Sequence, residues 1–228
     1  MPADPVRIGV VDSGCPEDGL RACRSAGFVL VDGRVARVAA APDRLGHGSA
    51  IDGVVRHLAP SAQLVVAQVF QQRFTTTALQ VAAAIDWLIG EDVAVINLSL
   101  GLSGDRPALA AACARAVDAG VIVCAASPAR GAPVYPSAYP GVFRMTGDAR
   151  CARDEVSWLA TRHADFGAHV RPLDGALAGS GASIGCAHLS GHVARLLHDG
   201  AARDAAAIAD ALQSQARYRG PEHRRGDA

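Results

Sequence analysis

Short runs of β-branched and apolar residues alternate along this chain with longer segments in which apolar residues recur at helical spacing. The strand-like runs cover residues 6–11, 64–70, 93–98 and 121–125. The helical segments cover residues 48–58, 78–89, 107–119, 183–198 and 201–213. Apolar strands that alternate with helices are typical of a parallel sheet covered by helices on both faces. We therefore predict a three-layer α/β fold with a mostly parallel central sheet flanked by helices.

The length and composition predict one domain. The chain has 228 residues, half of them are hydrophobic, and no stretch is of low complexity, so a substantial core can form. We expect a single compact domain over residues 1–215, with irregular loops and short strands over residues 130–181. Residues 216–228 are rich in arginine, and we predict that they form a mobile, solvated tail.

The charge balance excludes several partners. Lysine plus arginine equals aspartate plus glutamate at 22 each, so no overall field attracts nucleic acid or an anionic membrane. The longest apolar runs, such as residues 121–126, fall far short of the about 20 residues of a spanning helix, so we expect no membrane insertion. The first residues resemble no export signal, and we therefore expect a cytoplasmic protein.

The six cysteines are scattered without a CxxC pair. In the cytosol such thiols stay reduced, and we interpret them as small buried hydrophobic residues. Zinc sites normally use closely spaced thiolate pairs, and the acidic residues are too dispersed for a calcium loop. We predict no metal site and no cofactor.

Three glycine-rich segments suggest the chemistry, namely GVVDSG around Asp12, GHGSA around His47 and GSGASIGCAHLSG around Ser183. They resemble, in the same chain order, the DSG, HGTxVAG and GTSMAxPHVAG segments of subtilisin-like serine peptidases of family S8. INLSLG at residues 96–101 is similar to the substrate-binding strand of that family, and YPSAYPGV at residues 135–142 is similar to its YPAxYPxVI segment. The resemblance extends over residues 8–197 and implies a subtilisin-like fold.

The resemblance implies a catalytic triad of Asp12, His47 and Ser183. A serine hydroxyl becomes a good nucleophile when an imidazole removes its proton, and a carboxylate then orients the imidazole and stabilises its cation. Taken singly, Asp12 could be a loop residue or helix cap, and Ser183 could be an N-cap. The three residues together, in family order, favour the catalytic interpretation. We expect Asn97, which matches a family position inside the sheet, to form hydrogen bonds within the fold.

The segment CAASPARG departs from the family at the oxyanion hole. The asparagine that usually donates to the oxyanion aligns with Pro128, which has neither a side-chain donor nor an N–H group. The threonine that usually precedes the nucleophile is Ala182. We predict that the backbone N–H of Ser183 and the hydroxyl of Ser127 form the hole. A loop N–H group or Arg130 are the alternatives for the second donor.

The substrate would bind along the strand that ends at residue 101, whose backbone can pair with an extended peptide. The predicted substrate-binding residues are Ser99, Leu100, Gly101, Ala125, Ala126 and Arg130. The apolar members favour an apolar side-chain pocket, whereas Arg130 favours an acidic group, and the sequence does not decide between them. The opposite wall, QQRFTTTA at residues 71–78, is short and polar, so we expect it to be low.

These features predict an intracellular serine endopeptidase that acts on a peptide or protein substrate. A weakened oxyanion hole favours slow and selective cleavage, such as removal of a leader or propeptide from a specific partner. The chain resembles the compact subtilisin-like proteases that are encoded with ribosomal-peptide modification systems. A catalytically silent peptide-binding scaffold and a general degradative peptidase are the alternatives, and the oligomeric state is not predicted.

Overall fold

A computed structural model describes residues 5–175 and 181–222. These residues form six helices, which are α1 (Glu17–Ala22), α2 (His47–Leu58), α3 (Ala78–Gly90), α4 (Pro107–Asp118), α5 (Ala182–His198) and α6 (Ala205–Gln215). They also form a ten-stranded sheet, made of β1 (Arg7–Asp12), β2 (Arg24–Val31), β3 (Arg34–Val38), β4 (Gln63–Gln68), β5 (Val95–Leu98), β6 (Ile122–Ala126), β7 (Phe143–Gly147), β8 (Val156–Trp158), β9 (Phe166–Ala168) and β10 (Tyr218–Arg219).

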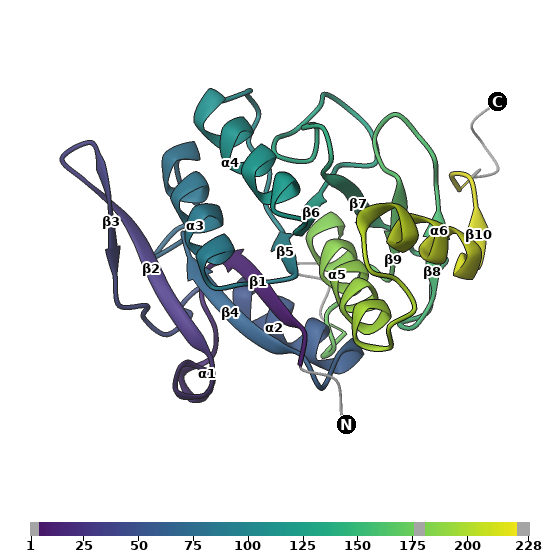
Figure 1. The fold of residues 1–228 in the computed structure, drawn as a ribbon, viewed down its shortest axis with the longest axis horizontal. Helices are drawn as coiled ribbons and strands as arrows, with labels where there is room; N and C mark the ends of the chain where they lie inside the picture. Colours follow the sequence, from purple (N-terminus) through teal and green to yellow (C-terminus); the bar gives the residue numbers. More distant parts are fainter. Residues whose placement is uncertain (1–4, 176–180, 223–228) are drawn as a thin grey trace.

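The sheet is mostly parallel. Its strand order is β10-β8-β9-β7-β6-β5-β1-β4-β2-β3, and its antiparallel pairs are β2 with β3 and β8 with β9. The β2–β3 hairpin extends from one end of the molecule, while β8 and β10 lie at the other end (Figure 1). The carboxyl ends of the central parallel strands therefore meet at one edge, where ligands of such sheets commonly bind.

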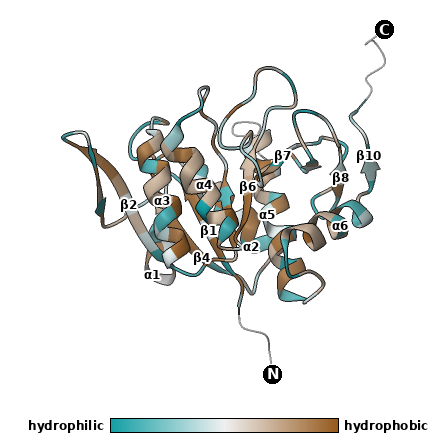
Figure 2. Cartoon of the chain, turned by 45° about the horizontal axis from the view of Figure 1, so that its top comes forward, coloured by the Kyte–Doolittle hydropathy of each residue, from teal (hydrophilic) through white to brown (hydrophobic). Residues whose placement is uncertain are grey.

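Alternate residues of the central strands enter two separate cores. Val95 and Ile122 pack with α2, α5 and α6, whereas their neighbours Ile96 and Val123 pack with α3 and α4. This follows from the period of two in a strand, which sends successive side chains to opposite faces. Apolar colouring prevails along the central strands in Figure 2, and helices α3 and α4 carry both apolar and polar residues. The predicted three-layer fold is confirmed.

Most predicted elements occur with small shifts at their ends. The last helix begins at Ala205 rather than at residue 201, because the Asp204 carboxylate accepts a hydrogen bond from the Ala207 N–H and caps it. The segment predicted to be a mobile tail, residues 216–228, includes the last strand, β10. In this strand Tyr218 pairs with Ser157 of β8. Residues 223–228 lie outside the described part of the chain. No helix among the described residues is both long and apolar enough to cross a membrane.

Candidate active site

Asp12 and His47 form a buried, hydrogen-bonded pair. Asp12 is the last residue of β1 and is fully buried, and His47 is the first residue of α2. The His47 Nδ1 atom lies 2.8 Å from Oδ1 and 2.9 Å from Oδ2 of Asp12. The Asp12 carboxylate also accepts a hydrogen bond of 2.7 Å from the Ser13 N–H. The pair fixes the ring so that Nδ1 carries the proton and Nε2 is the free base.

The start of α2 is held in place by the loop that precedes it. The Asp43 carboxylate accepts hydrogen bonds from the N–H groups of Leu45, Gly46 and Ser49 at 2.8–3.0 Å. Gly46 has a φ of 76°, a left-handed conformation that suits glycine. A Cβ at Gly48 would collide with a backbone carbonyl of the Asp12 loop. The glycines on both sides of His47 therefore let the helix approach the end of β1.

The environment raises the pKa of His47 above its ordinary value of 6.5. Burial lowers the pKa, but the hydrogen bond to Asp12 and the carboxylates of Asp12 and Asp43 together raise it by more. The imidazolium form is thus stabilised in the folded protein. Such stabilisation suits a residue that must accept a proton during the reaction.

Ser183 is the second residue of α5. A Cβ at Gly185 would collide with the Thr146 carbonyl of β7, so this helix begins in direct contact with the sheet. The Ser183 hydroxyl donates a 3.0 Å hydrogen bond to the Ser99 carbonyl oxygen. In return, the Ser99 hydroxyl donates to the Ser183 carbonyl at 2.9 Å. The two segments are thereby locked together at the end of β5.

Asn97 extends this lock into the core. Its Oδ1 atom lies 2.9 Å from the Ser99 hydroxyl, which can donate its one proton either there or to the Ser183 carbonyl. Its Nδ2 donates to Ser190 of α5 at 2.9 Å. All three side chains are buried. The expectation that Asn97 forms hydrogen bonds within the fold is confirmed. The role of Ser190 was not predicted, because a serine inside an apolar helix gives no distinctive pattern.

One cavity of about 600 Å³ contains both His47 and Ser183. Its walls are largely apolar, and the further lining residues are Leu45, Gly46, Ala50, Phe70, Phe74, Ser99, Pro172, Asp174 and Ile184. The Phe74 ring stands edge-on to the His47 ring, with centroids 5.7 Å apart, and its side chain is 62% exposed. The wall expected to be low and polar thus carries an aromatic ring beside the candidate base. The single Phe in QQRFTTTA is the sequence feature that could have indicated this aromatic contact.

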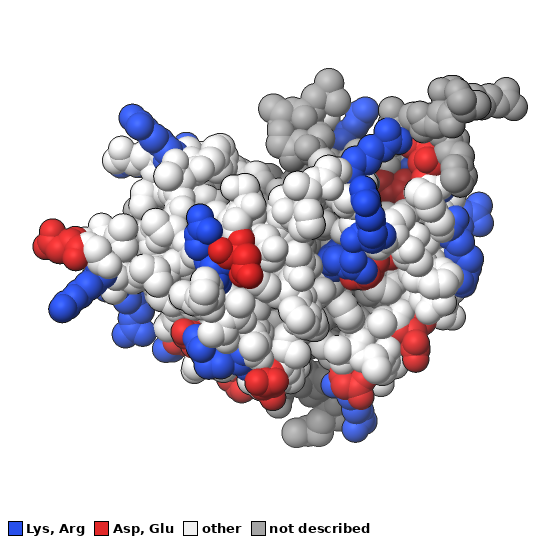
Figure 3. Space-filling model, turned by 90° about the horizontal axis from the view of Figure 1, so that it is seen from above, with Lys and Arg blue, Asp and Glu red and all other residues white. Residues whose placement is uncertain are grey.

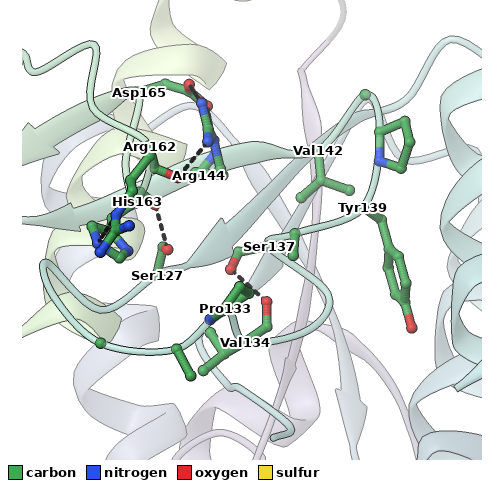
Figure 4. A pocket seen from close by; sticks show the side chains of 15 residues that line it. Ser127, Pro133, Val134, Ser137, Tyr139, Val142, Arg144, Arg162, His163 and Asp165 are labelled. Atoms are coloured by element: carbon green, nitrogen blue, oxygen red, sulfur yellow. Dashed lines mark hydrogen bonds and ion pairs between the residues drawn. The ribbon is translucent and has the colours of Figure 1, made fainter. Parts of the chain in front are cut away.

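Ser127 lies in a different cavity of about 620 Å³, with Pro133, Val134 and Tyr139 among its walls (Figure 4). Its hydroxyl donates a 2.5 Å hydrogen bond to the His163 carbonyl, and its N–H donates to the Met145 carbonyl at 2.8 Å. Both donors of Ser127 therefore point at carbonyl oxygens of the protein. The role of Ser127 in an oxyanion hole stays a prediction, and it would need the hydroxyl to rotate away from its present acceptor.

The other predicted substrate-binding residues do not gather at one place in the structure. Leu100 and Ala125 are buried in the core under α3 and α4, whereas Ala126 is buried in the opposite core. Gly101 is exposed and lies next to Val134. Arg130 lines a third cavity of about 660 Å³ beside the end of β7. Ser99 is the member of this set that lines the cavity with His47 and Ser183. The substrate-binding roles stay predictions.

A metal centre finds no support in the described residues. Within residues 5–175 and 181–222, no three His, Cys, Asp or Glu side chains gather closely enough to hold an ion.

The fold and the site together define a class of α/β proteins in which Asp, His and Ser follow in this chain order, with the His and the Ser in one cavity and the Asp buried behind the His. A model of the subtilase family matches residues 33–146, which is half of the chain. The chain therefore belongs to the subtilase family.

Curated relatives agree with this assignment. The minor extracellular protease Epr of Bacillus subtilis is 31% identical over 169 residues, which are 68% of this chain and 24% of that protein. Subtilisin E of the same organism is 26% identical over 94% of this chain and 61% of its own length. A solved structure of the S41 psychrophilic protease matches 92% of this chain and 82% of its own, with a TM-score of 0.65 at 21% identity, and supports the fold. The chain spans between about a quarter and three fifths of the first curated relatives.

Proposed function

We propose that this protein is a serine endopeptidase that hydrolyses peptide bonds by acyl transfer, with Asp12, His47 and Ser183 as its catalytic residues. One observation carries the proposal: the His47 ring is held by the Asp12 carboxylate at 2.8 Å and shares a largely apolar cavity with the Ser183 hydroxyl. Family membership supports the same activity, and the cavity accommodates part of a polypeptide substrate.

The reaction would begin when the Ser183 oxygen attacks the carbonyl carbon of the scissile bond. His47 accepts the hydroxyl proton at Nε2 and then donates it to the leaving amine as the carbon–nitrogen bond breaks. Water then attacks the acyl group on Ser183, gives its proton to His47, and releases the second product. Asp12 keeps the ring in the tautomer that both steps need and stabilises its cation.

In the structure the Ser183 hydroxyl donates its hydrogen bond to the Ser99 carbonyl, which is its arrangement without substrate. A hydroxyl has one proton to donate, so transfer to His47 requires that the Ser183 side chain turn away from Ser99. Breaking one neutral hydrogen bond in this way costs on the order of 1 kcal/mol, which a bound substrate can offset. Substrate binding would thus activate the nucleophile, a feature that favours selective cleavage.

The oxyanion would be stabilised by the amino end of α5. Ser183 lies in the first turn of this 17-residue helix, so its N–H group and the helix dipole can favour negative charge beside the serine oxygen. Pro128 and Ala182 carry no side-chain donor at the two family positions, and Pro128 has no backbone N–H either. Removal of one such donor in a subtilisin lowers turnover by about 100 to 1000 fold, and by analogy this enzyme should be slow.

A slow peptidase with an apolar cleft suits removal of a leader or propeptide from a specific partner inside the cell. The compact proteases of ribosomal-peptide modification systems act in this way, and the leader-removing protease of quinohemoprotein amine dehydrogenase maturation is the specific candidate. The six free thiols support an intracellular location. The face seen from above carries basic and acidic groups side by side (Figure 3), and the two signs balance over the whole chain at 22 each, which supports a protein substrate over nucleic acid.

Incubation with candidate leader-bearing peptides and with unfolded casein, followed by mass spectrometry of the products, tests this function. One cut in a leader peptide and few in casein are expected, and Ser183→Ala should abolish both. Cleavage of casein at many sites would favour a degradative enzyme. No cleavage of any peptide by the wild type would contradict peptidase activity and favour a binding scaffold. Equal cleavage by Ser183→Ala would contradict the assignment of Ser183 as the nucleophile.

A further inference from the structure

Cys15 and Cys23 lie in sulfur-to-sulfur contact outside the catalytic cavity. Their Sγ atoms are 3.4 Å apart, and both thiols are free. Cys15 lies shortly before the six-residue helix α1 and Cys23 directly follows it, so this helix brings the two together. Among the described residues, no second pair of thiols shows such a contact. A sulfur–sulfur bond of about 2.0 Å needs a modest approach from this distance.

The two thiols differ in their access to solvent. Cys15 is fully buried, whereas Cys23 is partly exposed and lines an open, polar cavity of about 350 Å³. Three arginines, Arg7, Arg24 and Arg56, share the walls of this cavity. A small polar oxidant can therefore reach Cys23 first, with Cys15 directly behind it.

The contact with Cys15, rather than the surrounding charges, favours a thiolate at the outer position. The hydrogen bond from Cys15, together with the nearby Arg56 guanidinium, lowers the pKa of Cys23 against the opposing effects of burial and of Asp52. The same contact and burial raise the pKa of Cys15, which stays a thiol. An accessible thiolate beside a second thiol is the arrangement of a redox-active cysteine with a resolving partner.

We propose that Cys15 and Cys23 form an oxidation site, at which hydrogen peroxide converts the two thiols to an intramolecular disulfide. The Cys23 thiolate attacks one peroxide oxygen, the O–O bond breaks, and water leaves after proton uptake, so that Cys23 becomes a sulfenic acid. Cys15 then attacks the Cys23 sulfur, the S–O bond breaks, and a second water leaves. Two thiols lose two electrons and two protons, and one peroxide is reduced to two waters.

The site is connected to the catalytic residues through the backbone. The Cys15 carbonyl accepts a 3.0 Å hydrogen bond from the N–H of Asp43, the residue whose carboxylate holds the first turn of α2. Cys15 also lies three residues after Asp12. The disulfide would therefore form beside both segments that position the Asp12–His47 pair.

The test uses the reduced protein, a stoichiometric amount of hydrogen peroxide, and a readout independent of peptidase activity. The intact mass should fall by about 2 Da, and a reductant should reverse the change. Trypsin cleaves after Arg21, between the two cysteines, so the oxidised protein should yield peptides 8–21 and 22–24 joined by a disulfide.

Variants distinguish this site from general oxidation. Cys15→Ser should instead gain about 16 Da as a sulfenic acid that reacts with dimedone, because Cys23 has lost its resolving thiol. Cys113→Ser, a change at a buried cysteine of α4, should still form the 15–23 linkage. The proposal is overturned if the wild type shows no linkage, if Cys23 proceeds to a sulfinic acid with Cys15 intact, or if the mass of Cys15→Ser still falls by about 2 Da.

Discussion

Acidification should destabilise this protein through two buried histidines of α5. His188 and His192 are 0% and 2% exposed, and they lie on the helix that begins with the Ser183 turn. Burial lowers the pKa of His188 to about 4, and the neighbouring His169 ring adds to the effect. Burial and the Arg195 guanidinium lower the pKa of His192 to about 3. Both rings are therefore neutral in the folded protein at pH 5.

The size of this destabilisation follows from the lowered pKa values of the two histidines. An unfolded histidine has a pKa near 6.5, so the unfolded state binds more protons below that pH and is favoured as the pH falls. Between pH 7.5 and 5, each ring lowers the free energy of unfolding by about 2 kcal/mol, with a limiting slope of about 1.4 kcal/mol per pH unit. Together they remove about 4 kcal/mol of the 5–15 kcal/mol typical of a domain. His47 acts in the opposite direction, because its raised pKa adds stability that is lost as the pH rises.

Urea unfolding at pH 7.5 and at pH 5 measures this loss. In His188→Gln or His192→Gln, the difference between the two pH values should shrink by about 2 kcal/mol, even if the variant is less stable at both. His57→Gln changes an exposed histidine of α2 and should leave the difference as in the wild type. An equal difference in the wild type and both α5 variants would refute the reasoning.

Four further predictions concern the site. Phe74→Ala should lower kcat/KM about 5-fold for peptides with an apolar residue before the scissile bond, because about 1 kcal/mol of contact with the ring is lost. Peptides with glycine at that position should show no such effect. Because the pKa of His47 is raised, activity should fall as the pH drops through a value above 6.5, and Asp12→Asn should shift this limb of the kcat/KM profile to lower pH. Gly48→Ala should cost about 1–3 kcal/mol in urea unfolding, whereas an unchanged stability would show that α2 can move away from the Asp12 loop. Ser127→Ala should lower turnover by about 100-fold if its hydroxyl serves the oxyanion, and an unchanged turnover removes it from the hole.

The central sheet was predictable because its strands are buried on both faces and therefore read as uninterrupted apolar runs. The β2–β3 hairpin was not predicted, although Asp32-Gly33 carries a turn signal. Both residues have positive φ, at 49° and 75°, as a two-residue hairpin turn requires. β3, the edge strand, has two arginines among its five residues, so its apolar runs are short.

The catalytic candidates were recognisable from local motifs, but their surroundings depend on contacts between distant segments. The edge-on contact of Phe74 with His47 joins residues from a loop and a helix start. The Ser127 hydroxyl finds the His163 carbonyl 36 residues away. The Cys15–Cys23 contact depends on a short helix between the two residues, and their spacing matches no thiol motif. Such contacts follow from the packing of the whole chain.

The most direct test of the account is whether the Ser183 hydroxyl is an activated nucleophile. A fluorophosphonate probe, followed by peptide mapping, should label Ser183 in the wild type. Ser99→Ala should still be labelled, because Ser99 is assigned no nucleophilic role. Labelling should be lost in Ser183→Ala and strongly reduced in His47→Ala, since the imidazole removes the serine proton. A wild-type protein that stays unlabelled while folded, or labelling that His47→Ala leaves unchanged, would contradict the catalytic assignment.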